Sequence, residues 1–402
     1  RSFAQSQRLT NLLRDITALT RLDEAFSLID VELLNLSQII HNIVSELALP
    51  LEEKQMTVTC SFPDNMMIDG NFSLLYSIFR NLTDNAIAYA GIGKKIKADL
   101  RGDIRDRELM KEVFAKYQPE IVFHLAAQPL VRLSYDIPVE TYEVNVMGTI
   151  HIMEAIRATK SVKVGIMVTT DKCYDNNEQK EGYVETSPFG GYDPYSSSKG
   201  ACEVAIQSWR RSFFNQADYG KKHTVSIASV RAGNVIGGGD WAKDRIIPDC
   251  IRALEANNII DIRSPKAVRP WEHVLEPLSG YMMLAQKMWE HPTEYNEGWN
   301  FGPDSESVCT VWEVATEIVK KYYSDEVSFG LIANKLRDLS DPNALHEAKL
   351  LMLNINKAKI RLEWKPRMDM QQCIELVVDW YKRYKNEDVY ALCIEEINKF
   401  IG

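Results

Sequence analysis

The sequence has 402 residues, 45% of them hydrophobic and 26% charged, a balance that predicts a folded protein of two or three domains. Its 56 Asp and Glu outnumber 47 Lys and Arg, which argues against nucleic acid as the ligand. No stretch reaches the roughly 18 uninterrupted apolar residues of a membrane span. Composition therefore excludes a disordered chain and favours neither a nucleic-acid nor a membrane partner.

Seven cysteines stand far apart, with no Cys-x-x-Cys pair. This spacing fits neither a zinc ribbon nor a disulfide scaffold, so we expect no metal site. Free thiols are typical of a reducing compartment, and the expected location is the cytoplasm.

The first 91 residues are acidic, with 6 Lys and Arg against 11 Asp and Glu. Apolar residues recur there at three- and four-residue steps, which predicts two amphipathic helices packed as in a bundle. A half-buried strand is expected over residues 56–62, and a third helix from about residue 71 to Tyr89. The helical positions are Leu9, Leu12, Leu13, Ile16, Leu19 and Leu22, then Leu36, Ile39, Ile40, Ile43, Val44 and Leu47.

Beyond residue 95, short apolar runs alternate with helical segments. This alternation predicts βαβ units in a doubly wound, Rossmann-type parallel sheet covered on both faces, an α/β fold. From about Gly237 we expect a smaller lobe over the carboxyl edge of the sheet, where ligands of such folds bind. The runs are 121–127, 144–157, 164–170 and 224–233, with a long helix from Ser197 between the last two.

Two groups of polar residues point to proton chemistry. Tyr195 and Lys199 are four residues apart at the start of a helix, so they share one face, and an ammonium near a phenol favours the phenolate. Taken alone, such a pair is more often a surface feature. The apolar run 164–168 then leads to Thr170, Asp171 and Lys172, at the edge where a doubly wound sheet places its ligands.

The front segment resembles the dimerisation and early ATP-binding region of a sensor histidine kinase. The resemblance is carried by residues 19–23, 69–75 and 81–90, and it implies that Asn85 helps to hold magnesium. The sequence departs from that family, because no histidine precedes His41 and no D-x-G-x-G loop follows Asn85. His41 is interpreted as an ordinary packed or surface histidine.

From Arg101 almost to its end, about three quarters of the chain, the sequence resembles an extended short-chain dehydrogenase/reductase of the NAD-dependent epimerase/dehydratase family. Within that family it is similar to the CDP-glucose 4,6-dehydratases. Each motif is weak alone, but their order and spacing are specific. They are Gly102–Asp106, His124–Gln128, Thr169–Tyr174, Tyr195–Lys199, Arg231–Asp240, Arg269–Val274 and Asn300–Pro303.

The resemblance implies a catalytic role for each polar residue near the sheet edge. Tyr195 would take the proton of the sugar 4-hydroxyl while NAD accepts the C4 hydride, and Thr170 would position that hydroxyl. Lys172 would remove the C5 proton and Asp171 would protonate the departing 6-hydroxyl. Related dehydratases commonly carry Glu at the position of Lys172, so the lysine points to CDP-glucose as substrate.

The resemblance also implies ligand-binding residues and a homodimer. Asp103 and Ile104 would meet adenine, while Ala126, Ala127 and Gln128 would line the dinucleotide path and Lys199 would bind the nicotinamide ribose. Arg269 is the candidate for the diphosphate, because guanidinium is forked and always charged. Asn234, Arg132 and His273 would accompany it, whereas the Gly237–Gly239 run is equally well a close backbone approach or a structural turn.

The glycine-rich turn that cradles pyrophosphate in this family is missing. Residues 90–95 supply two glycines without a preceding apolar strand, so the first strand and helix of the nucleotide fold are expected to be replaced and the sheet to be truncated. The expected domains are 1–91 and 92–402, the latter with a nucleotide-binding part at about 97–236 and a substrate lobe drawn mainly from 237–402.

Three functions therefore remain open. The chain is a dehydratase whose missing strand comes from elsewhere, a signalling protein that dimerises through kinase-like helices, or an inactive join of two parts.

Overall fold

The computed structural model describes residues 32–53, 56–60, 62, 65–70, 79, 95–98, 103–242, 244–304, 308–323, 328–340 and 350–402. The chain divides into two compact units. The first unit is Arg1–Gly102 with Lys385–Ala391, and the second unit is Asp103–Tyr384 with Leu392–Gly402.

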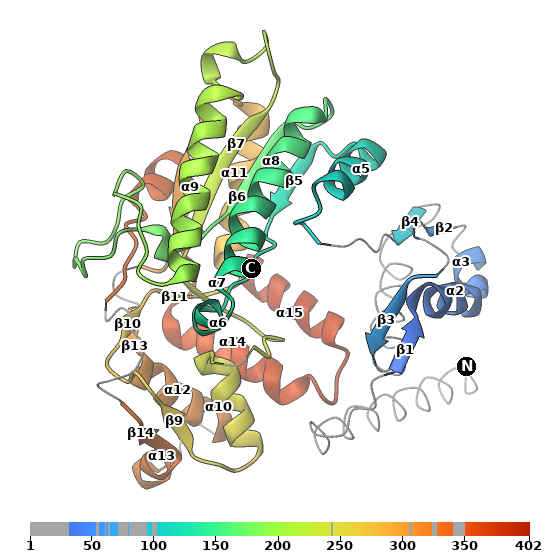
Figure 1. The fold of residues 1–402 in the computed structure, drawn as a ribbon. Coiled ribbons are helices and arrows are strands. Elements are labelled where there is room, and N and C mark those ends of the chain that lie inside the picture. Colours follow the sequence, from blue (N-terminus) through green and yellow to red (C-terminus); the bar gives the residue numbers. More distant parts are fainter. Residues whose placement is uncertain are drawn as a thin grey trace. The chain divides into compact units, whose positions relative to one another are not determined.

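The described part of the first unit contains two short helices and two pairs of strands (Figure 1). Asn35 caps the first of these helices by accepting a hydrogen bond from Gln38 N at 3.1 Å. The unit's elements are β1 (Glu32–Asn35), α2 (Leu36–Glu46), α3 (Ala48–Glu53), β2 (Thr57–Cys60), β3 (Met67–Gly70) and β4 (Lys95–Ala98). β1 pairs with β3 in the antiparallel sense, and β2 pairs with β4 in parallel.

The helix expected over residues 36–47 is confirmed, and Ile39, Ile43 and Leu47 lie in its buried core. The strand expected near residue 58 is also present. The helices expected over residues 9–22 and 71–89 fall outside the described residues, except for Phe79. The expected bundle stays a prediction, because its first helix lies outside the described residues, while the segments on either side of α2 and α3 pair as strands.

The second unit is built on a four-stranded, wholly parallel sheet, as expected, in the order β12-β7-β6-β5. Its strands are β5 (Ile121–His124), β6 (Val164–Val168), β7 (Ser226–Ala232) and β12 (Gly298–Phe301). Helices cover both faces (Figure 1). Val164 and Ile166 of β6 pack toward α11, whereas Met167 faces the core formed with α5, α8 and α9.

The helices around this sheet begin and end where the sequence provides caps. Asp193 caps α9 by accepting from Ser196 N at 2.9 Å, and Pro194 occupies its first turn. The segments are α5 (Arg107–Tyr117), α6 (Val131–Asp136), α7 (Pro138–Tyr142), the π-turn Glu143–Met147, α8 (Gly148–Ala158), α9 (Pro194–Ser212), the 3₁₀ turn Gln216–Asp218, α11 (Leu275–Glu290) and the π-turn Ala358–Leu362.

A second core joins the helices of the smaller lobe, where Ile251 of α10, Ile318 of α12 and Ile374 of α14 are fully buried. The helices are α10 (Ile246–Glu255), α12 (Val311–Tyr323), α13 (Phe329–Lys335), α14 (Met370–Arg383) and α15 (Val389–Ile401). The short strands, which form three two-stranded sheets, are β8 (Asn234–Ile236), β9 (Ile260–Ile262), β10 (Val268–Arg269), β11 (Trp271–His273), β13 (Cys309–Thr310) and β14 (Leu336–Asp338).

β5 is the edge strand of the four-stranded sheet. Ile121 in this strand is 42% exposed, and Leu125 just after it is 53% exposed. The expectation of a truncated sheet stays a prediction, because residues 71–78, 80–94 and 99–102 lie outside the described residues. No helix among the described residues is long and apolar enough to cross a membrane.

Candidate active site

The turn that follows β6 carries three of the expected catalytic residues. The apolar strand is buried, and its chain then enters a 3₁₀ turn over Asp171–Cys173. Thr170 Oγ1 accepts from Lys172 N at 3.4 Å and donates to Asp171 Oδ1 at 2.9 Å. The strand thus delivers a hydroxyl, a carboxylate and an ammonium at the carboxyl edge of the sheet.

Lys172 lies between two oxygens. Its Nζ donates to Asp171 Oδ1 and to Asn234 Oδ1, both at 3.2 Å. Asp171 is fully buried, whereas 26% of the Lys172 side chain is exposed. Asn234 begins β8, directly beyond β7, so neighbouring strands bring together residues far apart in the sequence.

Tyr195 and Lys199 project from the first turns of α9 toward the same strand end. Both side chains are buried. Tyr195 shares a side-chain hydrogen bond with Thr170, and Lys199 Nζ donates to Val168 O at 3.3 Å. Thr170 therefore connects the phenol of Tyr195 with the carboxylate of Asp171, and the five expected catalytic residues gather at one place.

The expected effect of Lys199 on the Tyr195 phenol stays a prediction. Burial raises the pKa of the Tyr195 phenol, and the hydrogen bond from Thr170 only partly offsets this. Lys199 directs its ammonium at the Val168 carbonyl, and burial lowers its own pKa.

A cavity of about 650 Å³ opens beside this cluster. Thr170, Lys172 and Tyr195 line it, and so do three residues expected to bind substrate. The substrate candidates on its wall are Arg132, Asn234 and Arg269. This volume is ample for a small-molecule ligand, and its combination of apolar walls with a few polar groups is typical of ligand sites.

Four guanidinium-bearing residues stand around the cavity, two of which the sequence did not single out. Arg245 is paired with Asp240 at 2.9 Å, and Arg263 is paired with Asp244. Arg269 is buried and donates to Val268 O at 3.0 Å. The sequence offers little indication of these two residues, because arginines are common in loops and their spacing does not show that they line one cavity.

His273 and the glycine turn are placed differently from the other substrate candidates. His273 is fully buried and is not part of the cavity wall, and burial lowers its pKa to about 4. A Cβ at Gly238 would lie 2.2 Å from the Trp380 ring, and Gly239 has φ +79°. This turn therefore serves the packing of its loop against α14.

The residues expected to bind the cofactor fall into two groups. Ala126 is exposed beyond β5, Ala127 is half-buried, and Gln128 is buried with its Nε2 bonded to Thr141 Oγ1 at 2.9 Å. Ile104 packs against α8, so closely that a Cβ at Gly148 would lie 2.5 Å from it. Asp103 is at the surface and binds Arg105.

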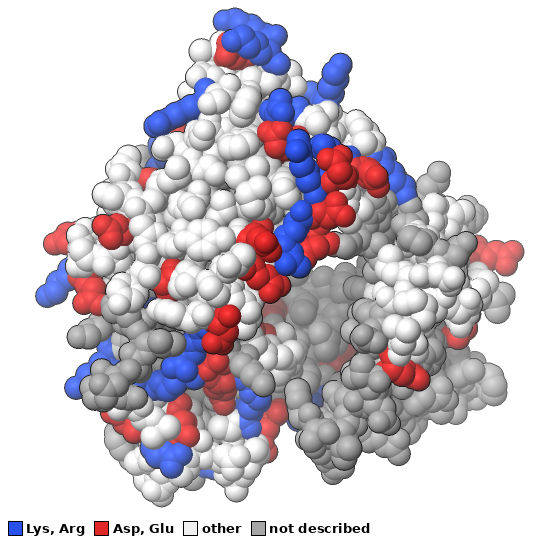
Figure 2. Space-filling model, viewed as in Figure 1, with Lys and Arg blue, Asp and Glu red and all other residues white. Residues whose placement is uncertain are grey.

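No glycine-rich cradle occurs in the part of the chain that the structure describes, and residues 90–94 lie outside it. Among the described residues, no three His, Cys, Asp or Glu could together hold a metal ion. On the face of the second unit seen in Figure 2, acidic and basic side chains are intermingled.

Comparison with known proteins identifies the family of the chain. The family model described as GDP-mannose 4,6 dehydratase matches residues 81–377. The CDP-glucose 4,6-dehydratase of Salmonella typhimurium is 47% identical over 302 residues, which cover 75% of this chain and 81% of that protein. The dTDP-D-glucose 4,6-dehydratase of Bos taurus is 27% identical over 70% of this chain and 73% of its own.

Two solved structures share the fold. The dTDP-glucose 4,6-dehydratase of Bacillus anthracis in complex with NAD has a TM-score of 0.59 at 19% identity and covers 86% of this chain and 93% of its own. The Streptomyces venezuelae dTDP-glucose 4,6-dehydratase double mutant with NAD bound gives 0.60 at 17%, over 86% and 94%. None of these matches supports the histidine-kinase resemblance of residues 1–91, and the family match begins inside that segment.

Proposed function

The chain belongs to the GDP-mannose 4,6 dehydratase family, and on that premise we propose that it converts CDP-glucose to CDP-4-keto-6-deoxyglucose. The enzyme is then a hydro-lyase, and its substrate occupies the cavity beside Tyr195. The observation that carries the choice of substrate is Lys172 beside Asp171 on the β6 turn, since related dehydratases commonly carry Glu there. The CDP-glucose 4,6-dehydratase of Salmonella typhimurium, at 47% identity, supports the same choice.

Tyr195 is the base for the sugar 4-hydroxyl in this proposal. Its phenol lines the cavity, and its hydrogen-bond partner Thr170 lines it too. Thr170 orients the hydroxyl that reacts, and for this its own hydroxyl proton turns from Asp171 Oδ1 toward the substrate. A general base must lie within hydrogen-bond reach of the proton it takes, and both side chains face the same space.

Lys172 and Asp171 divide the elimination of water between them. Oxidation at C4 makes the neighbouring C5 proton acidic, and Lys172, the more exposed of the two, removes it. Asp171 protonates the 6-hydroxyl as it leaves. A lysine ammonium must first lose its proton to act as a base, and the carboxylate at 3.2 Å is placed to receive it.

The chemistry that bound NAD would supply is a hydride acceptor for C4 oxidation and a hydride donor for C6. The residues that would hold its nicotinamide end are Tyr195 and Lys199. The Lys199 ammonium has three donors, and its partner among the described residues is the Val168 carbonyl, so donors remain for ribose hydroxyls. Asp103, Ile104, Ala126, Ala127 and Gln128 would line the rest of the cofactor. The nicotinamide half thus fits better than the pyrophosphate half.

The test is a dehydratase assay of the purified full chain with NAD and either CDP-glucose or dTDP-glucose, following the 4-keto-6-deoxy product. Product from CDP-glucose that disappears in Tyr195→Phe supports the proposal. Equal rates with both nucleotides would contradict the choice of CDP-glucose. No product from either, in a chain shown by calorimetry to bind NAD, would contradict the activity itself.

We further propose a homodimer in the cytoplasm, on the resemblance to related dehydratases and the seven free cysteines. Sedimentation of the purified chain checks whether it is a dimer.

The role of the front segment, residues 1–91, also stays a prediction. Removing residues 1–91 and measuring dimerisation separates a dimerising segment from an inert one.

A further inference from the structure

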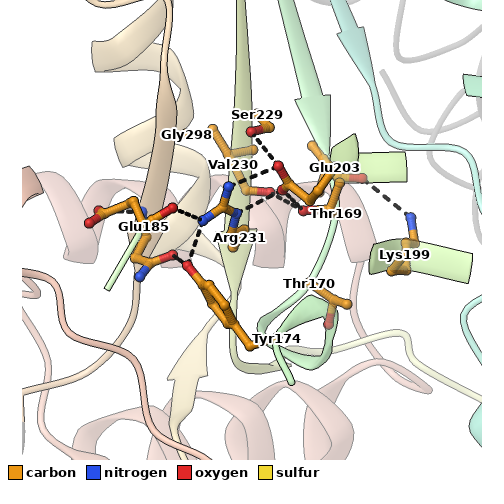
Figure 3. Close-up of polar contacts among 12 residues, drawn as sticks. Thr169, Thr170, Tyr174, Glu185, Lys199, Glu203, Ser229, Val230, Arg231 and Gly298 are labelled. Atoms are coloured by element: carbon orange, nitrogen blue, oxygen red, sulfur yellow. Dashed lines mark hydrogen bonds and ion pairs between the residues drawn. The ribbon is translucent and has the colours of Figure 1, made fainter. Parts of the chain in front are cut away.

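A buried ion pair lies directly beneath the catalytic turn. Glu203 of α9 and Arg231 of β7 have side chains that are 0% and 2% exposed. Arg231 donates twice, from Nε to Oε1 at 2.7 Å and from Nη2 to Oε2 at 2.8 Å. Thr169 Oγ1 and Ser229 Oγ donate to the same carboxylate at 2.5 and 2.8 Å, so both of its oxygens are fully engaged (Figure 3).

The opposite side of the guanidinium reaches a second group of residues. Arg231 Nη1 donates to the Tyr174 hydroxyl at 2.5 Å and to the Glu185 carbonyl at 3.2 Å. Tyr174 donates in turn to Asn300 Oδ1 at 2.7 Å. Gly298 makes room for this arrangement, because a Cβ there would lie 2.5 Å from Arg231 Nη2.

The ion pair therefore contacts both residues that flank one turn, Thr169 through Glu203 and Tyr174 through Arg231. Thr169 immediately precedes Thr170, and Tyr174 immediately follows the 3₁₀ turn that contains Asp171 and Lys172. Glu203 also lies on α9, four residues beyond Lys199 and eight beyond Tyr195, on the same helix face. One pair thus connects the helix that carries the proposed base with the turn that carries the proposed acid.

Stability alone gives a weak reason for this pair. Replacing a buried ion pair by apolar residues of similar volume is often neutral or stabilising, because desolvating two charges is costly. A bidentate pair with fully satisfied hydrogen bonds does fix geometry, and a displacement of about 1 Å near a reacting centre can cost about 10²-fold in rate.

We propose that Glu203 and Arg231 form a positioning clamp that sets the distance between Tyr195 and the Thr170–Lys172 turn. The proposal rests on the proposed dehydratase function. Neither residue of the clamp lines the cavity, so both act through Thr169 and Tyr174 rather than on the substrate.

Thr169 and Tyr174 are the two arms of the clamp, through which it contacts the turn. The clamp is tested with the arm variants Thr169→Val and Tyr174→Phe, which each remove one hydroxyl. Tyr183→Phe is the matched control, because Tyr183 is equally buried and stacks on Tyr174 at 5.2 Å, but its hydroxyl binds Asn176 and Asn177 instead. We expect kcat to fall about 10-fold or more in both arm variants, with KM for CDP-glucose unchanged, and neither to change in the control.

A second readout separates positioning from general loosening of the fold. The Thr170 hydrogen bond lowers the pKa of Tyr195, with Arg245 acting in the same direction and Asp171 and Asp193 opposing it. If the arm variants move Thr170 away, the pKa of Tyr195 rises, and the acid limb of the kcat profile shifts to higher pH. Fluorotyrosine NMR of the full chain reports the same titration without turnover.

The outcomes are distinguishable. An unshifted Tyr195 titration in both arm variants, or equal losses in the Tyr183→Phe control, would overturn the clamp. A shifted titration in a chain that does not turn over CDP-glucose would leave the clamp standing and contradict the proposed function instead.

Discussion

The ammonium of Lys172 lies 3.2 Å from Asp171 Oδ1, so the proposed base and the proposed acid form an ion pair. The proposed roles require a neutral amine on Lys172 and a proton on Asp171, and one proton passed along this contact would meet both requirements. The second carboxylate oxygen, Asp171 Oδ2, is buried and has no partner among the described residues.

The first prediction is that the two residues act as a unit. We expect Lys172→Met and Asp171→Asn each to lower kcat by about 10²- to 10⁴-fold, the usual size of general acid–base catalysis. The double variant should lose little more than either single one, because removing one member already disables the pair. Steady-state rates with CDP-glucose measure this.

An exposed ion pair provides the control. Lys222 lies 3.0 Å from Asp218 on the surface, with 75% of its side chain exposed. Lys222→Met and Asp218→Asn should leave kcat unchanged. Additive losses for the catalytic pair would mean that the two residues work independently.

The second prediction concerns the contribution of the Glu203–Arg231 ion pair to stability at low pH. Burial raises the pKa of Glu203, but the charge of Arg231 and the hydrogen bonds from Arg231, Thr169 and Ser229 lower it more. A carboxyl with a lowered folded pKa contributes stability that is present above its unfolded pKa of about 4.3 and is lost as pH falls through the folded value. Urea unfolding of the wild type should therefore weaken below about pH 4 more steeply than that of Glu203→Gln.

Other variants of the same two residues measure how much stability is lost when the ion pair is broken. Arg231→Met leaves a buried carboxylate without its counter-ion and should lower the free energy of unfolding by about 3–5 kcal/mol at neutral pH. Glu203→Leu combined with Arg231→Met should recover most of this loss. A double variant as unstable as the single one would indicate that shape rather than charge matters there.

The fold of the second unit followed from sequence where local pattern and burial agree. The run 164–168 became a buried strand, and the Asp193-Pro194 start became the capped beginning of α9. The strand pairs β1–β3 and β2–β4 were not predicted as sheets, because four-residue strands contain too little alternation. The order of the strands in the sheet could not be predicted from the sequence, because strand order and register depend on contacts between distant segments.

The catalytic cluster was predictable for a related reason. Carboxyl ends of parallel strands meet at one edge, which placed Thr170–Lys172 near Tyr195 and Lys199. His273 was expected at the substrate and is buried outside the cavity wall, because a motif gives a residue's neighbours in sequence and not its burial. Glu203 and Arg231 were missed although a signal existed: Arg231 is a single charge in an otherwise uncharged buried strand, and such a charge needs a partner.

The third prediction concerns Glu396 in α15. Burial raises its pKa to about 7, Asp379 adds to the effect, and Oε1 is buried and unsatisfied among the described residues. A carboxyl with a raised folded pKa removes stability as pH rises from its unfolded value toward the folded one. Glu396→Gln should melt at a higher temperature than the wild type at pH 8.

At low pH the same comparison should show little difference, because Glu396 is then neutral in both states. Calorimetry at about pH 3 and at pH 8 provides the two measurements, since an unfolded Glu, with a pKa of about 4.3, is still largely ionised at pH 4.5. A wild type that is the more stable protein at pH 8 would contradict the raised pKa and would indicate that Lys399 or Arg383 pairs with the carboxylate.

The last prediction tests the phosphate end of the cavity. Arg269 is 4% exposed and lies on the cavity wall, where its guanidinium can donate hydrogen bonds to two oxygens of a diphosphate. Hydrogen bonds to charged groups contribute about 1.5–3 kcal/mol, so Arg269→Gln should raise KM for CDP-glucose by about 10- to 100-fold. Arg269→Lys should recover only part of this, because an ammonium is a point charge. Arg157→Gln, which removes an exposed partner of Glu154 away from the cavity wall, is the control and should leave KM unchanged. Isothermal titration with CDP alone checks that the loss is in nucleotide binding. Unchanged CDP binding in Arg269→Gln would assign the diphosphate to Arg245 or Arg263 on the same wall.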